Sequence, residues 1–362
     1  MRASFAMSRT LLFAEVPNFY AAAERAADLT LTERPVIVGG DPRKRATVQS
    51  ATPDALARGV VEGMPLLEAL ARCPRARALR TNMRRYREVS LQLKACLRQS
   101  VERIEPVGLS AAYMDLTELG SEPSILGQKL QEQVRQRLAL PLRVGIAAVK
   151  FVARLAAEEA QASGLRRVLV GEEAAFLAPL CVARLPGVGP HAEERLAQLG
   201  VRQIGEVVAL GRERLEALFG NRGPELLALA RGAGDVHVRG TRAPQSLSQE
   251  STFESDVLSV SLLEERVQEI ARGLESVLHA QSLATRRVTL KLRYANLESV
   301  TRSQSVTPAV TRAHDIAALA QDLLAKTRAG DRPVRLLGIS LGSFTRARRD
   351  DRQLDLFPRS SS

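Results

Sequence analysis

The sequence contains no tryptophan, and aromatic residues make up only 4% of its 362 residues. A nucleic-acid site built mainly from base stacking on aromatic side chains is therefore not expected. Only three cysteines are present, and none belongs to a CxxC pair: Cys73, Cys96 and Cys181. An odd number of widely separated cysteines predicts free thiols in a reducing compartment rather than a disulfide framework.

Histidines and long apolar runs are equally sparse. The four histidines are scattered along the chain, so no zinc site is expected: His191, His237, His279 and His314. No apolar run approaches membrane-spanning length, and residues 1–8 lack the apolar core of a signal peptide. We therefore expect a cytoplasmic protein with no membrane contact.

Positive charge is abundant. Lys and Arg number 52 against 40 Asp and Glu, which gives a net charge of +12 and a pI near 10.4. Such an excess favours a polyanionic partner, most commonly nucleic acid. The alternative is a basic but unspecialised protein from a genome rich in arginine codons.

Hydrophobic periodicity predicts an α+β multidomain protein. Apolar runs predict strands at 11–16, 35–40, 107–116 and 142–148, which alternate with predicted helices at 19–27, 84–101, 124–138 and 150–162. This layout indicates a mixed sheet covered by helices. Residues 172–233 are predicted to be helical, 234–249 to form a polar linker, and 250–345 to form a smaller α+β domain.

A glycine turn between two predicted helices is the first binding motif. Gly187, Val188 and Gly189 have the pattern of a helix-hairpin-helix element, in which small residues let backbone N–H groups approach a DNA phosphate. Residues 220–223 resemble a weaker second copy. The alternative is an ordinary helical hairpin with a C-cap glycine.

A basic strand is the second motif. Alternation places Arg287, Lys291 and Arg293 on one face of the predicted strand at 287–294. That face suits a phosphate backbone, although a solvated sheet face would carry the same residues.

Five segments in order resemble bacterial Y-family (DinB/UmuC-like) translesion DNA polymerases: 15–24, 59–65, 104–115, 145–153 and 185–189. The resemblance implies a right-hand architecture, with a palm at 9–26 and 80–165, fingers at 27–79 and a thumb with its helix-hairpin-helix at 166–233. A linker at 234–249, a little finger at 250–345 and a disordered tail at 346–362 complete the expected domains.

The resemblance also exposes departures from the family pattern. Family members hold two Mg²⁺ ions with carboxylates, and the corresponding positions here are Glu15, Ser110 and Ala111. Tyr20 and Lys150 remain from the nucleotide site, although packing is the favoured interpretation for both. This degenerate pattern resembles the ImuB-type branch, whose members lack the catalytic acids and act as adaptors in mutagenic repair.

The sequence therefore predicts a chain that is not an enzyme and has no cofactor and no metal site. It would bind a DNA primer-template and work with an ImuA-like protein and an error-prone C-family polymerase. Two alternatives stay open. The chain could be a weakly active translesion polymerase that uses Glu15 and Mg²⁺ or Mn²⁺, or a blocker that occupies the sliding clamp.

The C-terminal tail carries an independent motif. Its residues resemble the bacterial peptide that binds the sliding clamp (beta subunit): Gln353, Leu354, Asp355, Leu356 and Phe357. Apolar residues in a charged tail suit a partner's groove. Docking of the tail on the chain's own body is the alternative. A partner of this kind implies association with the nucleoid.

Overall fold

The computed structural model describes residues 9–41, 45–161, 164–240 and 244–347. The chain divides into two compact units, residues 1–242 and 243–362. The predicted clamp motif at 353–357 lies outside the described residues. Among the described helices, none combines the length and the apolar character needed to cross a membrane.

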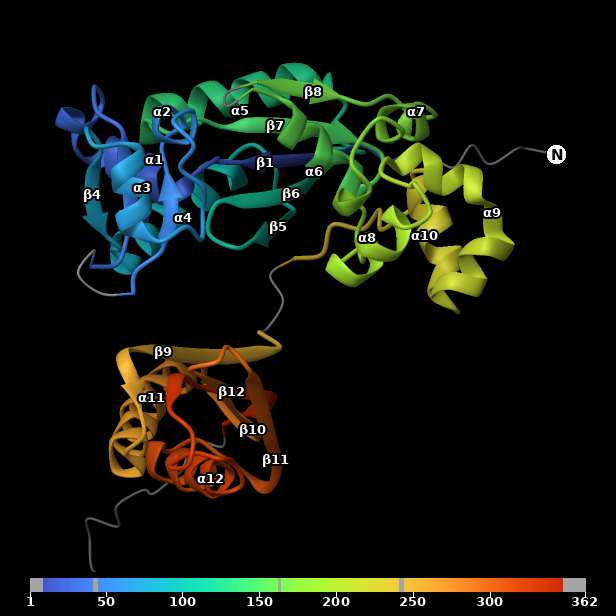
Figure 1. The fold of residues 1–362 in the computed structure, drawn as a ribbon. Coiled ribbons are helices and arrows are strands. Elements are labelled where there is room, and N and C mark those ends of the chain that lie inside the picture. The colour runs from blue at the N-terminus through green and yellow to red at the C-terminus, as the bar shows by residue number, and fades with distance from the viewer. Residues whose placement is uncertain (1–8, 42–44, 162–163, 241–243, 348–362) are drawn as a thin grey trace, which may run out of the picture. The chain divides into compact units, whose positions relative to one another are not determined.

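A five-stranded sheet forms the centre of the first unit, with the order β5-β6-β1-β7-β8 (Figure 1). Its strands are β1 (Leu11–Glu15), β5 (Ile104–Val107), β6 (Ala111–Asp115), β7 (Arg143–Ala147) and β8 (Leu165–Arg167). Strand β1 runs antiparallel to both neighbours, and Glu15 lies opposite Ala111 on one side and Arg143 on the other. Glu15, the last residue of β1, therefore lies between two strands that are distant from it in the sequence.

The alternation of β1 distributes its side chains between two cores, because successive strand residues face opposite sides. Leu12 and Ala14 pack in one core, on the face covered by α1 (Phe19–Ala27), α4 (Met83–Arg98) and α5 (Pro123–Leu138). Leu11 and Phe13 pack in the other, beneath α6 (Lys150–Glu159). Glu15 shares the parity of Leu11 and Phe13 and belongs to the α6 face.

Gly145 fixes the close approach of α6 to the sheet. A Cβ atom at this position would lie 1.9 Å from the carbonyl oxygen of Ala153 and 2.4 Å from the backbone nitrogen of Ala157. Only glycine fits there, because both obstructing atoms belong to the helix backbone.

The single strand predicted at 107–116 is corrected by the structure. The segment instead forms the end of β5 and all of β6, which pair as antiparallel neighbours. Gly108 turns the chain between them with a φ of 56°, a value that glycine adopts readily. The apolar run concealed this reversal.

A smaller three-stranded sheet follows α1, with the order β3-β2-β4. Its elements are β2 (Val36–Gly39), β3 (Val48–Ala51) and β4 (Arg77–Arg80), with the 3₁₀ helix η1 (Leu29–Leu31) and the helices α2 (Pro53–Leu56) and α3 (Leu66–Arg72). Its core contains Ile37, Val48 and Leu66, which are at most 2% exposed.

The helical prediction for 172–233 agrees with the structure. The elements are α7 (Glu173–Leu177), the 3₁₀ helix η2 (Val182–Arg184), α8 (Pro190–Ala197), α9 (Ile204–Phe219) and α10 (Arg222–Ala230). Their apolar side chains continue the core beneath α6, so this segment extends the core on that side of the central sheet.

The second unit is a four-stranded antiparallel sheet with the order β11-β10-β12-β9 and two helices. Its elements are β9 (Ser246–Val257), α11 (Val260–Gln281), β10 (Leu283–Tyr294), β11 (Ser299–Val310), α12 (Ala313–Ala325) and β12 (Val334–Arg346). Strand β9 begins inside the stretch predicted as a linker. It is a largely exposed edge strand, so its polar residues gave no hydrophobic periodicity.

Candidate functional site

Glu15, at the end of the central strand β1, forms an ion pair with Arg143. Arg143 donates to Glu15 Oε2 from Nε at 3.0 Å and from Nη2 at 2.6 Å, and both side chains are about one-quarter exposed. This two-point contact fixes the carboxylate and neutralises its charge.

The two neighbouring positions supply packing and backbone contacts. Ala111 is 2% exposed and belongs to the core beneath α6. The carbonyl oxygen of Ser110 accepts a hydrogen bond from the N–H of Val16 at 3.0 Å. Within the described ranges, no group of three or more His, Cys, Asp or Glu side chains could hold a metal ion. The only carboxylate among these three positions is that of Glu15, and it is already paired with Arg143. These residues therefore do not fit a pair of Mg²⁺ ions.

Lys150 begins α6 and lies at the centre of a second charge network. Its Nζ donates to both oxygens of Glu105, at 2.7 and 2.8 Å, and lies 3.5 Å from Asp235 Oδ2. The same ammonium lies 4.8 Å from the centre of the Tyr113 ring. Lys150 is only 8% exposed, so the fold surrounds this predicted site residue with its own partners.

The segment after α10 closes this network. Asp235 accepts hydrogen bonds from Arg239, whose backbone N–H donates to Glu105. Burial by itself raises the pKa of Asp235, but the N–H of His237 and the charges of Lys150 and Arg239 outweigh it, so the net shift is downward. Residues 235–239, predicted to be part of a linker, are thereby attached to the first unit.

Tyr20 packs in an aromatic pair. Its ring stacks on that of Tyr86 with centres 4.3 Å apart and planes 10° from parallel. The Tyr86 hydroxyl donates to buried Glu24 at 2.8 Å, and burial raises the pKa of Tyr86. The orientation of Tyr20 is thus set by stacking on a fixed neighbour.

The predicted hairpin lies between η2 and α8. Gly187 has a φ of 86°, and a Cβ atom on it would lie 2.4 Å from Nη2 of Arg222. That nitrogen donates to the Gly187 carbonyl oxygen at 3.3 Å. Val188 packs against the core, while a Cβ on Gly189 would meet open space. The turn therefore presents open backbone just before the N-terminus of α8.

The weaker second copy differs from this hairpin. A Cβ on Gly223 would lie 2.4 to 2.5 Å from backbone atoms of Leu215 and Glu216. Gly223 therefore permits α9 and α10 to pack closely, and Arg222 links this turn to Gly187.

Lys150 and the hairpin meet at one cavity of about 510 Å³, whose lining includes Tyr113, Gly187 and Arg222. The structure thus brings together two predicted site elements that are 37 positions apart in the chain.

The basic strand of the second unit has the predicted alternation. Val288, Leu290 and Leu292 are buried, whereas Arg287, Lys291 and Arg293 face outward. Lys291 pairs with Glu250 at 2.8 Å, and Arg293 donates to the Ser299 hydroxyl at 3.1 Å. Arg287 is the most open of the three predicted DNA contacts.

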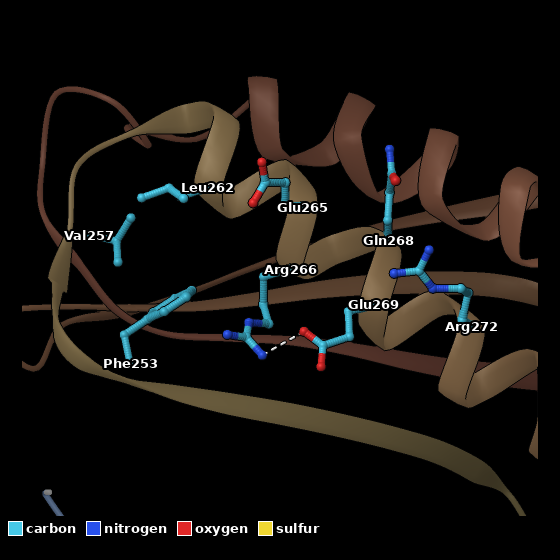
Figure 2. A pocket seen from close by; sticks show the side chains of 8 residues that line it. All are labelled: Phe253, Val257, Leu262, Glu265, Arg266, Gln268, Glu269 and Arg272. Carbon is cyan, nitrogen blue, oxygen red and sulfur yellow. Dashed lines mark hydrogen bonds and ion pairs between the residues drawn. The ribbon is translucent and has the colours of Figure 1, made fainter.

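A groove lies between β9 and α11 in the second unit, and Figure 2 shows the side chains that line it. Its volume is about 490 Å³, and Phe253, Val257 and Leu262 form its apolar part. Arg266 lies 5.7 Å from the Phe253 ring centre and pairs with Glu269. The charge of Arg266 is thus partly neutralised within the groove.

Sequence reasoning missed the partners Arg143, Glu105 and Asp235. Arg143 lies 128 positions from Glu15, and Asp235 lies 85 positions from Lys150. Only strand register and chain path bring these charges together, and the apolar pattern used to find the strands carries no information about them.

Two models of the impB/mucB/samB family match the chain. The family model covers residues 15–158, and the model of the family's C-terminal domain covers residues 244–356. Together they span more than half of the chain and match part of each compact unit.

Curated relatives match almost end to end. The chain is 36% identical to DNA polymerase IV of Halorhodospira halophila, over 96% of this chain and 98% of the relative. It is 33% identical to DNA polymerase IV of Alkalilimnicola ehrlichii, over 96% and 99% of the two chains, and 34% identical to that of Methanoculleus marisnigri, over 92% and 94%.

Solved structures show the same fold. A Y-family DNA polymerase chimera of Dbh and Dpo4 superposes with a TM-score of 0.84 at 21% identity, over 92% of this chain and 98% of that one. An insertion ternary complex of Dbh DNA polymerase superposes with a TM-score of 0.66, again at 21% identity and over 92% and 98% of the two chains.

These relatives correct one expectation. The prediction that the chain is not an enzyme is wrong by this comparison, because relatives 33 to 36% identical over nine-tenths of the chain are named DNA polymerase IV, an enzyme. The prediction gave decisive weight to the metal-ligand positions Glu15, Ser110 and Ala111, although it had identified the family from segments spread along the chain. With its palm, fingers and little-finger architecture, the chain belongs to the impB/mucB/samB family, the Y-family DNA polymerases.

Proposed function

We propose that the protein binds a DNA primer-template in translesion synthesis and acts as an adaptor that its tail tethers to the bacterial sliding clamp. The family match across both units, at 15–158 and 244–356, supports the DNA-binding part of the proposal, and the sequence of the tail motif supports the clamp contact. Solved neighbours of the same fold include ternary complexes of Dbh DNA polymerase.

The hairpin supports a phosphate contact. Gly189 leaves the backbone accessible before α8, and the positive end of a helix dipole favours an anion there. Arg222 adds a guanidinium against the same turn. A strand that tracks the outward face of β10 would meet Arg287, Lys291 and Arg293.

The tail motif supports clamp binding by its composition. Leu356 and Phe357 would bury in an apolar groove of the clamp, and Gln353 would orient the peptide. Tethering raises the effective concentration of the protein at the primer end. An ImuA-like protein and an error-prone C-family polymerase are the partners proposed for recruitment at the nucleoid.

The test measures DNA and clamp binding separately. We expect primer-template affinity to fall steeply with added salt, because released counterions drive phosphate binding. Phe357→Ala should abolish clamp binding and leave DNA affinity unchanged. A flat salt response would contradict the DNA interface, and an unchanged clamp affinity would contradict the tail assignment.

A cellular measurement separates the adaptor from a clamp-occupying blocker. Deletion of the gene should lower damage-induced mutagenesis for an adaptor. An increase would favour the blocker.

Alongside the adaptor role, nucleotide addition by the protein itself is a candidate function that the names of the relatives favour, and Glu15 is the carboxylate that it would use. Its test is primer extension with Mg²⁺ or Mn²⁺ by the wild-type protein and Glu15→Ala. Extension that disappears in the variant would assign the activity to this carboxylate, and extension that persists would assign it elsewhere.

A further inference from the structure

A basic hollow lies on the fingers, apart from the palm. Its volume is about 490 Å³, and its lining comes from the loop before β2, from α2 and the turn after it, and from the loop before β4 with the first residue of β4: Glu33, Arg34, Pro35, Asp54, Arg58, Pro74, Arg75, Ala76 and Arg77. Helix α1 separates it from Glu15, because the helix begins at Phe19 and its nine residues span about 13 Å.

Positive charge dominates this hollow. Four guanidinium groups line it, against the carboxylates of Glu33 and Asp54. Asp54 is already neutralised by Arg25, which donates to both its oxygens at 2.9 and 2.8 Å. A net positive charge therefore remains for a ligand to neutralise.

The backbone of the hollow is fixed in advance. Arg25 also donates to the carbonyl oxygens of Leu31 and Arg34, at 3.2 and 2.7 Å. The N–H of Arg77 donates to the Pro35 carbonyl at 2.7 Å, which joins the two loops that carry Arg34 and Arg75. A ligand would therefore meet a wall held in place by the chain itself.

Three of the arginines are not held by hydrogen bonds, although the charge of Arg77 also acts on nearby Asp28. Within the part of the chain that the structure describes, the side chains of Arg34, Arg75 and Arg77 make no hydrogen bond or ion pair, and all three residues are exposed. Arg58 makes one contact, to the Asp54 carbonyl oxygen. Like charges gathered in one hollow repel one another until an anion enters.

We propose that this hollow binds the phosphate backbone of a nucleic-acid strand that extends beyond the primer-template held by the palm and thumb. Planar guanidinium groups bind phosphate oxygens at two points. The hollow has no aromatic residue to stack on a base, which favours a strand backbone over a free nucleotide. Its few apolar residues, two prolines and one alanine, offer no anchor for a peptide side chain.

The inference rests on the proposed DNA binding, and its test uses two substrates with the full-length protein. One is a primer-template with a template overhang of about four nucleotides, and the other has an overhang of about 16 nucleotides, near the range that single-strand sites cover. The test variant is Arg34→Ala/Arg75→Ala/Arg77→Ala. The control, Arg87→Ala/Arg98→Ala/Arg103→Ala, removes the same charge from exposed positions outside the hollow.

Fluorescence anisotropy at several salt concentrations gives the readout. The wild-type protein and the control should bind the long overhang more tightly than the short one. The test variant should lose that difference, with a slope of log affinity against log salt reduced by about 2 on the long substrate, since three single-strand phosphate contacts are removed. Its affinity for the short substrate should match that of the control.

Each other outcome has a defined meaning. An unchanged preference for the long overhang in the test variant overturns the inference, whereas failure of the wild-type protein to bind either substrate contradicts the proposed function itself. Binding of a deoxynucleoside triphosphate or an oligoglutamate peptide that depends on these arginines, without an effect of the overhang, would overturn the strand in favour of a nucleotide or an acidic protein partner.

Discussion

The palm and the fingers differ in how far their charged side chains are paired within the chain. In the palm, Glu15 pairs with Arg143, and Lys150 pairs with Glu105 and Asp235. In the fingers, the arginines around the hollow at 33–35 and 74–77 exceed the carboxylates near them. Charges satisfied inside the chain contribute to folding, whereas charges left open are available to a ligand. The two regions should therefore respond differently to substitution.

Lys150→Ala should have the largest effect on this comparison. Removal of a nearly buried ammonium takes the ion-pair partner from Glu105 and leaves Asp235 with Arg239 alone, and breaking a buried pair costs about 3 to 5 kcal/mol of unfolding free energy. Urea denaturation measures the loss. Arg84→Ala is the control, because Arg84 is 91% exposed beside Glu88, and its stability should not change measurably. Equal unfolding free energies for the two variants would contradict a stabilising ion-pair network around Lys150.

Gly145→Ala should have the next largest effect. The new methyl group would collide with the backbone of α6 at Ala153 and Ala157, and overpacking of this kind costs about 3 kcal/mol. Gly189→Ala is the control, since a Cβ there would meet open space. Thermal unfolding of both variants provides the measurement, and a small loss at Gly145 would show that α6 can move away from the sheet.

Acid should weaken the palm network through Asp235. Its folded-state pKa is lowered, so its contribution is present above the unfolded value of about 3.9 and is lost as the pH falls through the lower folded value. Stability measured from neutral pH to acid should therefore decline below about pH 4. Asp235→Asn should be less stable at neutral pH and should decline less in acid. An identical pH profile for the variant would exclude Asp235 as a contributor.

Arg75→Ala in the hollow should have the smallest effect on stability. Its side chain has no partner within the chain as described, so the unfolding free energy should change by no more than about 0.5 kcal/mol. A loss of unfolding free energy comparable with that of Lys150→Ala would show that Arg75 contributes to folding, as the paired charges of the palm do.

Much of the fold was predictable because the periodicity of apolar residues within a segment indicates its secondary structure. The strands at 11–15 and 143–147 and the helices at 19–27 and 123–138 follow from apolar periodicity. Strand β9 was missed because an exposed edge strand has few buried side chains. The hairpin at 104–115 was missed because its turn depends on Gly108 inside an apolar run.

The candidate site was predictable only in part. The sequence located Glu15, Lys150 and the Gly187 turn, but it gave no partner for any of them. It also led to the wrong conclusion about enzymatic activity, because the substituted metal-ligand positions were given more weight than the resemblance to translesion polymerases along the chain, which the DNA polymerase IV relatives bear out.

The sequence by itself determined the family, the order of the elements and the excess of positive charge. Tertiary structure alone decided which charges are paired and which remain open. Arg143 reaches Glu15 through the register of β1 and β7, and the arginines of the hollow converge from three separate segments of the chain. Local patterns depend on a few neighbouring residues, whereas charge pairing depends on distances that exist only once the chain has folded.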